Sequence, residues 1–277
     1  MWAQRAWVGR FLPANTAIGR ELHAYTRLLN AVEGNTTFYA APTPSIVARW
    51  RDQALPGFRF VFKVPNHITH DQRLRGIAAE LAAFCQRMEP LGDLVGGFTL
   101  QLPASFGPDD LDALDWTLRQ RSTAWRWSVE VRHAAFFSGS GRIALDSILS
   151  SHGVERVLLD TESLFSHPPI TDDGRAEWEQ KPRVPALHEP LTDNPIVRFI
   201  GTDDPATTAA GIAHWQPIVA DWLREGRTPT VFLHTPDNTG TPALALAFHQ
   251  ALTATVPGLA PLPTPRLLHT HEQRSLF

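Results

Sequence analysis

Residues 32–74, VEGNTTFYAAPTPSIVARWRDQALPGFRFVFKVPNHITHDQRL, decide the fold of this chain. A short apolar strand ends at Glu33, a helix is predicted from about Pro44, and a second strand follows over residues 58–64. Strand, helix and strand, with ionisable residues where each strand ends, is typical of a parallel α/β enzyme, because such enzymes build their active sites at those ends.

Strand-like apolar runs recur along the rest of the chain at roughly the spacing of one strand-helix unit. Most are almost continuously apolar, as expected of strands covered on both faces. They are residues 30–35, 59–64, 95–102, 127–133, 154–160, 196–201 and 230–234. Helical patterns alternate with them at residues 18–29, 74–88, 207–224 and 243–252, and in a segment ending near Gln120. The alternation predicts an α/β fold, a TIM-type (β/α)8 barrel.

One strand of the eight is missing or truncated in this prediction, and the shortage lies at the front of the chain. The first helix is expected from about Thr16, and the residues MWAQRA before it do not read as a barrel strand. Either the barrel is open at one seam, or the chain starts too late. An open seam leaves two unpaired strand edges that favour aggregation, so we expect a late start or a truncation. A chain begun at an upstream start codon then melts at a higher temperature.

Two stretches do not fit the alternating pattern. Residues 163–193 are rich in Pro, Asp and Glu and too long for an ordinary connector, so they form either a loop that covers the substrate or a plain insertion. Residues 255–277 are predicted to be a Pro-rich linker and mobile tail, after a single barrel domain formed by residues 1–254.

Composition narrows the possible functions. With a net charge of −3, the chain has no general attraction to nucleic acid or to anionic membranes. Cys85 is the only cysteine, which excludes an internal disulfide and a cysteine-based zinc site, and it lies in an apolar run typical of the core. No signal-peptide or membrane-spanning run is found, so we expect a cytoplasmic protein without membrane contact.

Motifs spread over most of the chain resemble those of one known family. The matching residues are Gly9, Phe11, Pro13, Val32, Glu33, Asn35, Thr37, Phe38, Tyr39, Pro42, Trp50, Phe58, Phe60, Lys63, Thr69, His70, Leu74, Gln101, Leu102, Pro103, Phe106, Glu130, Arg132, His133, Arg198 and Gly201. To about Leu252 the chain resembles the domain-of-unknown-function-72 family, also called YecE-like. The resemblance implies a TIM-barrel fold in a bacterial protein. It implies a scaffold and a pocket rather than a reaction, since the family has no established activity.

The chain departs from the family pattern at several places. The family's first-strand motif is absent before Trp2, its His-Gly pair appears as Ile200-Gly201, and its paired asparagines appear at residues 234–238. The aromatic after the Arg-His pair appears as Phe136 or Phe137. Three of these changes lie on the expected catalytic face, so the activity need not be that of the relatives.

Ionisable and amide side chains at or near the carboxyl ends of the predicted strands form the candidate site. Glu130 and Arg132 are two residues apart on one strand and face the same side, either as a structural ion pair or as a carboxylate beside an oxyanion-binding arginine. Lys63 is either a base or Schiff-base nucleophile with a lowered pKa, or an anion clamp. The predicted catalytic residues are Glu33, Lys63, His70, Glu130, Arg132, His133 and Asp160, and the predicted substrate-binding or anion-binding residues are Asn35, Gln101, Arg198, His234 and Asn238.

The candidate site supplies the ligand types of a divalent metal, but no short ligand motif such as HExxH occurs. Because ligands in barrels are normally scattered along the chain, this absence decides little. A divalent metal therefore stays a possibility without assigned ligands, and no other cofactor is predicted.

The C-terminal residues carry a second motif. Gln273, Leu276 and Phe277 form Gln-x-x-Leu-Phe, which resembles the bacterial peptide that binds the DNA sliding clamp. The alternatives are coincidence in an apolar tail, or docking of Leu276 and Phe277 on the barrel. The motif makes the sliding clamp a predicted partner.

Three hypotheses of function follow. The first is an enzyme that acts on a phosphate-bearing or nucleic-acid substrate, tethered to the clamp and serving DNA repair; the acidic net charge and scarce lysines stand against nucleic acid. The second is a small-molecule isomerase, lyase or glycosidase acting on a sugar or sugar phosphate, with Glu33 and Glu130 as acid and base. The third is a non-catalytic adaptor that uses the tail. We expect an enzyme rather than an adaptor.

Overall fold

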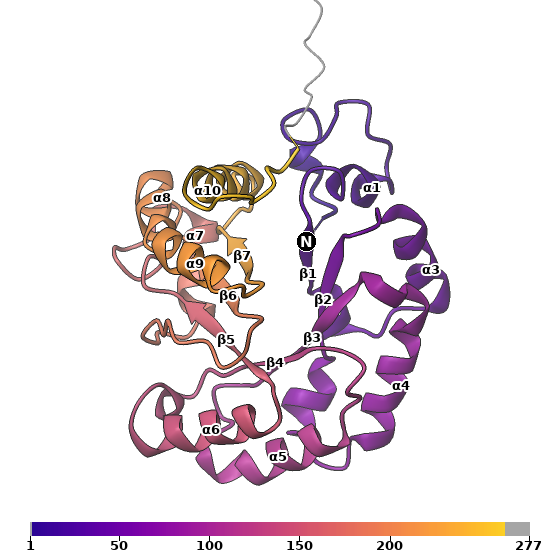
Figure 1. The fold of residues 1–277 in the computed structure, drawn as a ribbon, viewed down its shortest axis with the longest axis vertical. Coiled ribbons are helices and arrows are strands. Elements are labelled where there is room, and N and C mark those ends of the chain that lie inside the picture. The colour runs from indigo at the N-terminus through magenta and orange to yellow at the C-terminus, as the bar shows by residue number, and fades with distance from the viewer. Residues whose placement is uncertain (1, 264–277) are drawn as a thin grey trace, which may run out of the picture.

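The computed structural model describes residues 2–263, which form a nearly closed α/β barrel of the TIM type. Seven parallel strands pair in sequence order, and helices surround them (Figure 1). The predicted fold class is confirmed, and each predicted strand is present. The strands are β1 (Ala31–Gly34), β2 (Arg59–Lys63), β3 (Val95–Gln101), β4 (Trp127–Glu130), β5 (Glu155–Asp160), β6 (Ile196–Ile200) and β7 (Thr230–His234).

Some of the helices begin at a residue whose side chain caps the first turn. The Thr43 side chain accepts a hydrogen bond from the Ile46 amide at the start of α3, and Asp204 does the same for Thr207 in α8. The helices are α1 (Glu21–Tyr25), α2 (Thr36–Tyr39), α3 (Pro44–Gln53), α4 (Ala78–Met88), α5 (Leu111–Gln120), α6 (Gly139–Ser151), α7 (Asp172–Gln180), α8 (Pro205–Ala213), α9 (Trp215–Arg224) and α10 (Thr241–Thr255).

Several helix predictions were wrong in extent. The helix expected from Leu74 begins only at Ala78, because Leu74 and Gly76 have φ angles of 61° and 69°, outside the helical region. The single helix expected over residues 207–224 is two helices, since Pro217 lacks the amide hydrogen that a continuous helix needs. The irregular stretch 163–193 contains α7, and α6 was not predicted at all.

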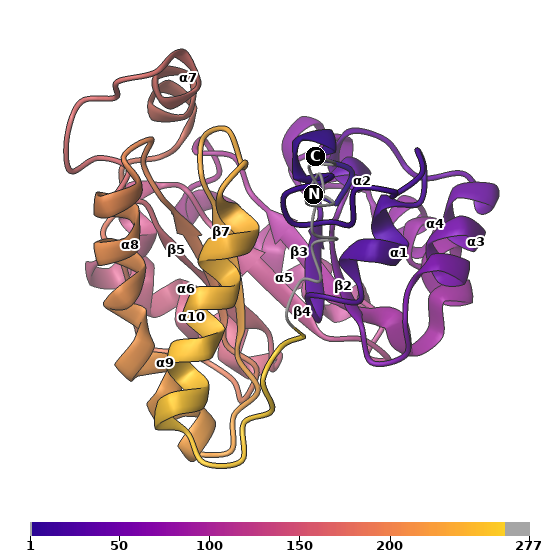
Figure 2. The ribbon, with the colours of Figure 1, turned by 90° about the horizontal axis from the view of Figure 1, so that it is seen from above.

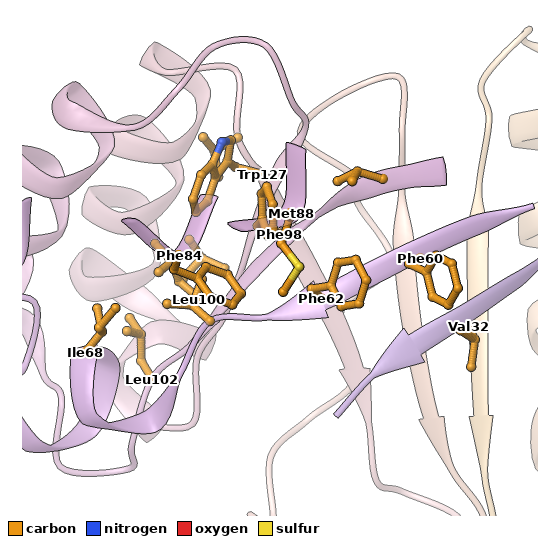
Figure 3. Close-up of a cluster of buried hydrophobic side chains, with 14 of the residues drawn as sticks. Val32, Phe60, Phe62, Ile68, Phe84, Met88, Phe98, Leu100, Leu102 and Trp127 are labelled. Carbon is orange, nitrogen blue, oxygen red and sulfur yellow. The ribbon is translucent and has the colours of Figure 1, made fainter. Parts of the chain in front are cut away.

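The larger apolar core lies between the strands and the helices outside them. Phe62, Phe98 and Trp127 are in register on neighbouring parallel strands, so their side chains share one face of the sheet. That face meets α4, where the rings of Phe84 and Phe98 lie 5.5 Å apart and Met88 is fully buried (Figure 3). Phe62, Phe98 and Trp127 therefore point outward to the helices.

The alternate positions of the same strands point into the barrel, and many of them are polar. Glu33, Lys63 and Glu130 lie one residue away from outward-facing apolar side chains on their strands. Arg198 of β6 contacts carboxylates on both β1 and β4, strands that it does not pair with, and such contacts are possible only across the interior. Strand alternation thus concentrates charge inside the barrel.

The barrel has a seam between its first and last strands. Within residues 2–263, β1 and β7 form no ladder with each other, and every residue of β7 is only partly buried. A cavity of about 500 Å³ runs along the seam, from Arg59 near one end of the strands to Asn238 near the other. The Trp7 indole bridges the seam by donating a hydrogen bond of 2.8 Å to the Asn238 carbonyl. The seam is where the eighth strand of a closed barrel would lie.

No helix among the described residues is long and apolar enough to cross a membrane. The predicted partner-binding residues Gln273, Leu276 and Phe277 lie outside the described residues.

Candidate functional site

Five charged side chains meet inside the barrel near the carboxyl ends of four strands. We call Glu33, Lys63, Glu130, Arg132 and Arg198 the interior charge cluster. The Arg198 Nε lies 3.2 Å from Glu33 Oε1, and its Nη1 lies 3.6 Å from Glu130 Oε2. Arg132 donates from Nε and Nη2 to Glu130 Oε1, at 3.2 and 3.0 Å. The cluster therefore joins β1, β2, β4 and β6 into one charged site.

Lys63 has a neutral side chain as its nearest polar partner. Its Nζ donates a hydrogen bond of 2.7 Å to Gln101 Oε1 and lies 3.5 Å from Glu33 Oε2. The buried Thr37 hydroxyl donates to the Lys63 carbonyl at 2.6 Å and so fixes the backbone at the end of β2. Lys63 is thus held in place by neutral groups, at the edge of a carboxylate that Arg198 also binds.

Burial and charge together set the pKa values in the cluster. Burial raises the pKa of Glu33 and Glu130, but the adjacent Arg198 and Lys63 outweigh it and hold both values below the ordinary range. Burial lowers the pKa of Lys63, Arg198 lowers it further, and the two carboxylates restore only part, so it falls to about 8. Both carboxylates are therefore ionised at neutral pH, and Lys63 is the member that loses its proton most easily.

His70 and Asn35 lie at the rim of the cluster. Burial lowers the pKa of His70, and Arg132 lowers it further. Its ring lies 5.1 Å from the ring of Phe38 and 2.9 Å, at Nδ1, from the Thr69 hydroxyl. Asn35 lines the seam cavity together with Glu33 and contributes a hydrogen bond that favours the ionised form of this carboxylate. Both residues are thus placed beside the predicted catalytic groups.

Helix α7 brings one residue to the site that sequence reasoning missed. The Glu177 Oε2 lies 3.2 Å from His234 Nε2, at the end of β7, and 2.7 Å from Lys181 Nζ. Burial raises the pKa of Glu177, but His234 and Lys181 lower it to about 2. Figure 2 shows α7 beyond the end of the barrel, away from the other helices. No local motif pointed to Glu177 as a site residue, because its partner His234 comes from a distant strand.

The structure does not bring every predicted residue into the cluster. His133 Nδ1 accepts a hydrogen bond from the Ala135 amide and so caps the short helix Ala134–Phe137. Asp160 points outward to the helices and accepts a hydrogen bond of 2.7 Å from the Trp215 indole. Burial raises the pKa of Asp160, although the bond from Trp215 lowers it. Both contacts hold local structure in place, so the structure gives His133 and Asp160 structural roles and does not place them in the interior charge cluster.

The remaining predicted residues divide between the cluster and the seam. Gln101 belongs to the cluster through its bond to Lys63. Asn238, like Arg198 and His234, lines the seam cavity, where it accepts the bond from Trp7 through its backbone. Among the described residues, no group of three His, Cys, Asp or Glu side chains is arranged to hold a metal ion.

Comparison with known proteins places this architecture in a family. A family model described as "Protein of unknown function DUF72" matches residues 1–267. The chain belongs to the DUF72 family. It is 37% identical over 278 residues to the UPF0759 protein YecE of Escherichia coli strain K12, an alignment that covers 100% of this chain and 97% of that protein. The family resemblance read from the sequence is confirmed.

Solved structures of DUF72 proteins share the barrel. A DUF72 family protein of Thermotoga maritima MSB8 is 20% identical, with a TM-score of 0.66, and the match covers 91% of this chain and 96% of that one. A DUF72 family protein of Enterococcus faecalis V583 is 19% identical with the same TM-score, and the match covers 87% of this chain and 91% of that one. These similarities support the fold, and they assign no reaction, substrate or clamp binding to it.

Proposed function

We propose that this DUF72 protein is an enzyme that acts on a small phosphate-bearing substrate, bound near the carboxyl ends of β2, β4 and β6. The observation that carries the proposal is the surplus of positive charge in the interior charge cluster. Among the described residues, the only carboxylates within 4 Å of Lys63, Arg132 and Arg198 are those of Glu33 and Glu130, so three cations share two carboxylates. A phosphate group entering the cluster balances that charge, and arginine binds phosphate oxygens in a fixed fork geometry.

The neighbouring cavity favours a small substrate. Its volume of about 500 Å³ lies in the range of small-molecule sites, and Arg198, His234 and Asn238 line it. The net charge of −3 and the presence of only two lysines offer little of the basic surface that nucleic-acid backbones require. These features support a sugar phosphate or a similar metabolite over a nucleic acid.

The pKa values also separate the candidate reactions. A glycosidase needs one carboxyl group with a raised pKa as general acid. Glu33 and Glu130 instead have lowered pKa values, because Arg198 and Lys63 offset the effect of burial. Of the small-molecule reactions, an isomerase or lyase acting on a sugar phosphate is therefore better supported than a glycosidase.

Phosphate binding to Arg132 variants tests the proposal. Arg132 is the cluster's most accessible cation, with 18% of its side chain exposed. We expect Arg132→Gln to weaken the binding of inorganic phosphate and sugar phosphates, measured by calorimetry, about tenfold. Arg49→Gln, which removes an exposed arginine of α3, is the control with the same change in net charge. Equal affinities in the two variants, or no binding by the unsubstituted protein, would overturn the proposal.

A nucleic-acid substrate is the alternative outcome. DNA with an abasic site, incubated with the protein and divalent metal ions, tests it directly. Cleavage at the abasic site, lost in Arg132→Gln but kept in Arg49→Gln, would replace the small substrate by DNA. If the protein neither binds nor cleaves this DNA, the small phosphate-bearing substrate remains the proposal.

We also propose that residues 273–277 bind the bacterial sliding clamp. Their sequence Gln-x-x-Leu-Phe supports this, since a clamp peptide of this form is anchored by few side chains. Replacing Gln273, Leu276 and Phe277 by alanine should reduce binding to purified clamp about tenfold or more. Alanine at Arg274 and Ser275, which lie between the anchors, is the matched control. Unchanged binding in the triple variant would exclude both the tether and the adaptor.

A further inference from the structure

Lys63 is the one cation of the interior charge cluster whose closest polar partner is uncharged. Its Nζ lies 2.7 Å from the Gln101 amide oxygen, whereas Glu33 Oε2 is 3.5 Å away. The side chain is only 5% exposed, so water contributes little to the solvation of its charge. A lysine in such surroundings is poorly stabilised in its protonated form.

The two arginines take the closest positions on the cluster's carboxylates. Arg198 binds Glu33 at 3.2 Å, and Arg132 binds Glu130 at 3.0 Å. Arginine stays protonated at all ordinary pH values, so any loss of charge from the cluster falls on Lys63.

The charged groups that face Lys63 come from β1, β4, β6 and the segment after β4, while the neighbouring strand β3 supplies the neutral Gln101. Glu33 on β1 and Glu130 on β4 raise its pKa, whereas Arg198 on β6 and Arg132 beyond the end of β4 lower it. With burial as the largest effect, the pKa of Lys63 falls to about 8. Roughly a tenth of the side chains are then neutral amines at pH 7. A neutral amine in a dry, ordered site is a nucleophile toward carbonyl carbon.

We propose that Lys63 Nζ forms an imine with an aldehyde or ketone of the substrate. The inference rests on the proposed function and names the substrate class more closely, as a phosphate ester that also carries a carbonyl group. The lone pair of Nζ forms a bond to the carbonyl carbon while the C=O π bond opens and its oxygen takes up a proton. The oxygen then leaves as water, the nitrogen gives up its protons, and a C=N bond remains. Amine and carbonyl become imine and water, and nothing is oxidised or reduced.

The chain provides its own control for this chemistry. Lys63 and Lys181 are its only lysines. The Lys181 Nζ lies 2.7 Å from a Glu177 carboxylate oxygen, so its closest partner is charged, whereas that of Lys63 is the neutral Gln101. An adduct on Lys63 is therefore distinguished from general amine labelling by the position of the modified peptide.

Reductive trapping tests the proposal. The unsubstituted protein is incubated with dihydroxyacetone phosphate and sodium cyanoborohydride, which reduces an imine to a stable amine, and the modified lysine is located by peptide mass mapping. We expect roughly tenfold more label on Lys63 than on Lys181. Lys63→Arg should lose the label and Lys181→Arg should keep it. Mapping on the unsubstituted protein gives the answer even if Lys63→Arg does not fold.

A second ligand separates failure of the imine from failure of the proposed function. Glycerol 3-phosphate carries the phosphate without the carbonyl, so it should bind and compete with the labelling. If it binds but dihydroxyacetone phosphate leaves no label on Lys63, the imine is overturned and the phosphate site stands. If unphosphorylated dihydroxyacetone labels Lys63 equally fast and glycerol 3-phosphate does not compete, the imine stands and the phosphate site falls. Equal labelling of both lysines overturns the imine.

Discussion

Glu130 is completely buried, and its position along β4 decides what it contacts. Val129, one residue earlier, packs in the apolar core outside the strands, while Glu130 meets Arg132 and Arg198 inside the barrel. Because solvent does not reach Glu130, its charge and those of Arg132 and Arg198 stabilise one another, and removing one leaves the others without a partner. The same alternation places Lys63 in the interior directly after Phe62 of the apolar core. Adjacent residues of one strand thus belong to the apolar core and to the candidate site.

Removing the charge of Glu130 should destabilise the fold strongly. Glu130→Gln leaves Arg132 and Arg198 without the carboxylate that balances them, at a cost of about 3 kcal/mol in the free energy of unfolding by urea. Asp52→Asn, in a pair whose side chains are both more than half exposed, should cost at most about 1 kcal/mol. Equal losses in the two variants would show that the cluster is solvated.

Cys85 should be inert in the folded protein. It is a residue of α4 whose side chain is buried in the apolar core, and burial raises the pKa of its thiol to about 12. Because the thiolate is the reactive form, a thiol reagent at pH 8 should modify Cys85 only in denaturant. Stoichiometric modification of the native protein would contradict the burial.

Helix α7 is the element that couples the segment 163–193 to the site. It begins where the Thr171 hydroxyl accepts a hydrogen bond from the Gly174 amide, and Asp203 accepts bonds from the Ile170 and Thr171 amides. Its other attachment is the contact of Glu177 with His234 at the end of β7. The segment predicted to be irregular therefore contains a helix attached to the loop after β6 and to the end of β7, and His234 of the second attachment lines the seam cavity.

Loss of the Glu177 contact should loosen α7 alone. Glu177→Gln removes the charge that attracts His234 and Lys181, so hydrogen exchange should become faster in residues 172–180 and stay unchanged in β3 and β4. Glu179→Gln, an exposed position on the same helix, is the control. Unchanged exchange in Glu177→Gln would remove this contact as an anchor.

The contact of Glu177 with His234 and Lys181 should weaken at low pH. The folded-state pKa of Glu177 is about 2, below its ordinary value of 4.5, so the contact adds stability above about pH 4.5 and loses it as the pH falls toward 2. Exchange protection of α7, corrected for the intrinsic rate at each pH, should fall in that window. Glu177→Gln should abolish this part of the pH dependence, and a variant that kept it would assign the titration to another group.

The whole barrel is a closed ladder interrupted at one seam. Strands β2 to β6 each pair on both sides, whereas β1 and β7 each pair on one side within residues 2–263. The cavity along the seam reaches from outer residues such as Phe248 to Arg198 of the interior charge cluster. The candidate site is thus reached by the cavity along the seam, through Glu33 and Arg198.

Exchange along the sheet should follow this pairing. Amides of β7 should exchange faster than those of β4, because β7 has one paired neighbour and partly buried residues, while β4 is buried throughout. Hydrogen exchange followed by mass spectrometry of peptides from both strands measures the difference. Equal protection of β7 and β4 would mean that the seam is closed in solution.

The sequence by itself determined the barrel and its polar ends. Continuous apolar strands at regular spacing specify a parallel sheet covered by helices, and the alternation along each strand places Glu33, Lys63 and Glu130 on one face. Local signals also located most helices, although α6 and α7 were missed and Pro217 and Gly76 changed the bounds of others. These features could be predicted because they depend on residues close together in the chain.

Only the tertiary structure decided which charged groups meet. Arg198 joins Glu33 and Glu130 because closure of the sheet brings β6 opposite β1 and β4. Asp160 is separated from the cluster because its position on β5 faces the helices, and Glu177 reaches His234 because α7 lies beyond the end of β7. Such pairings depend on distances between segments far apart in sequence, which no local pattern records.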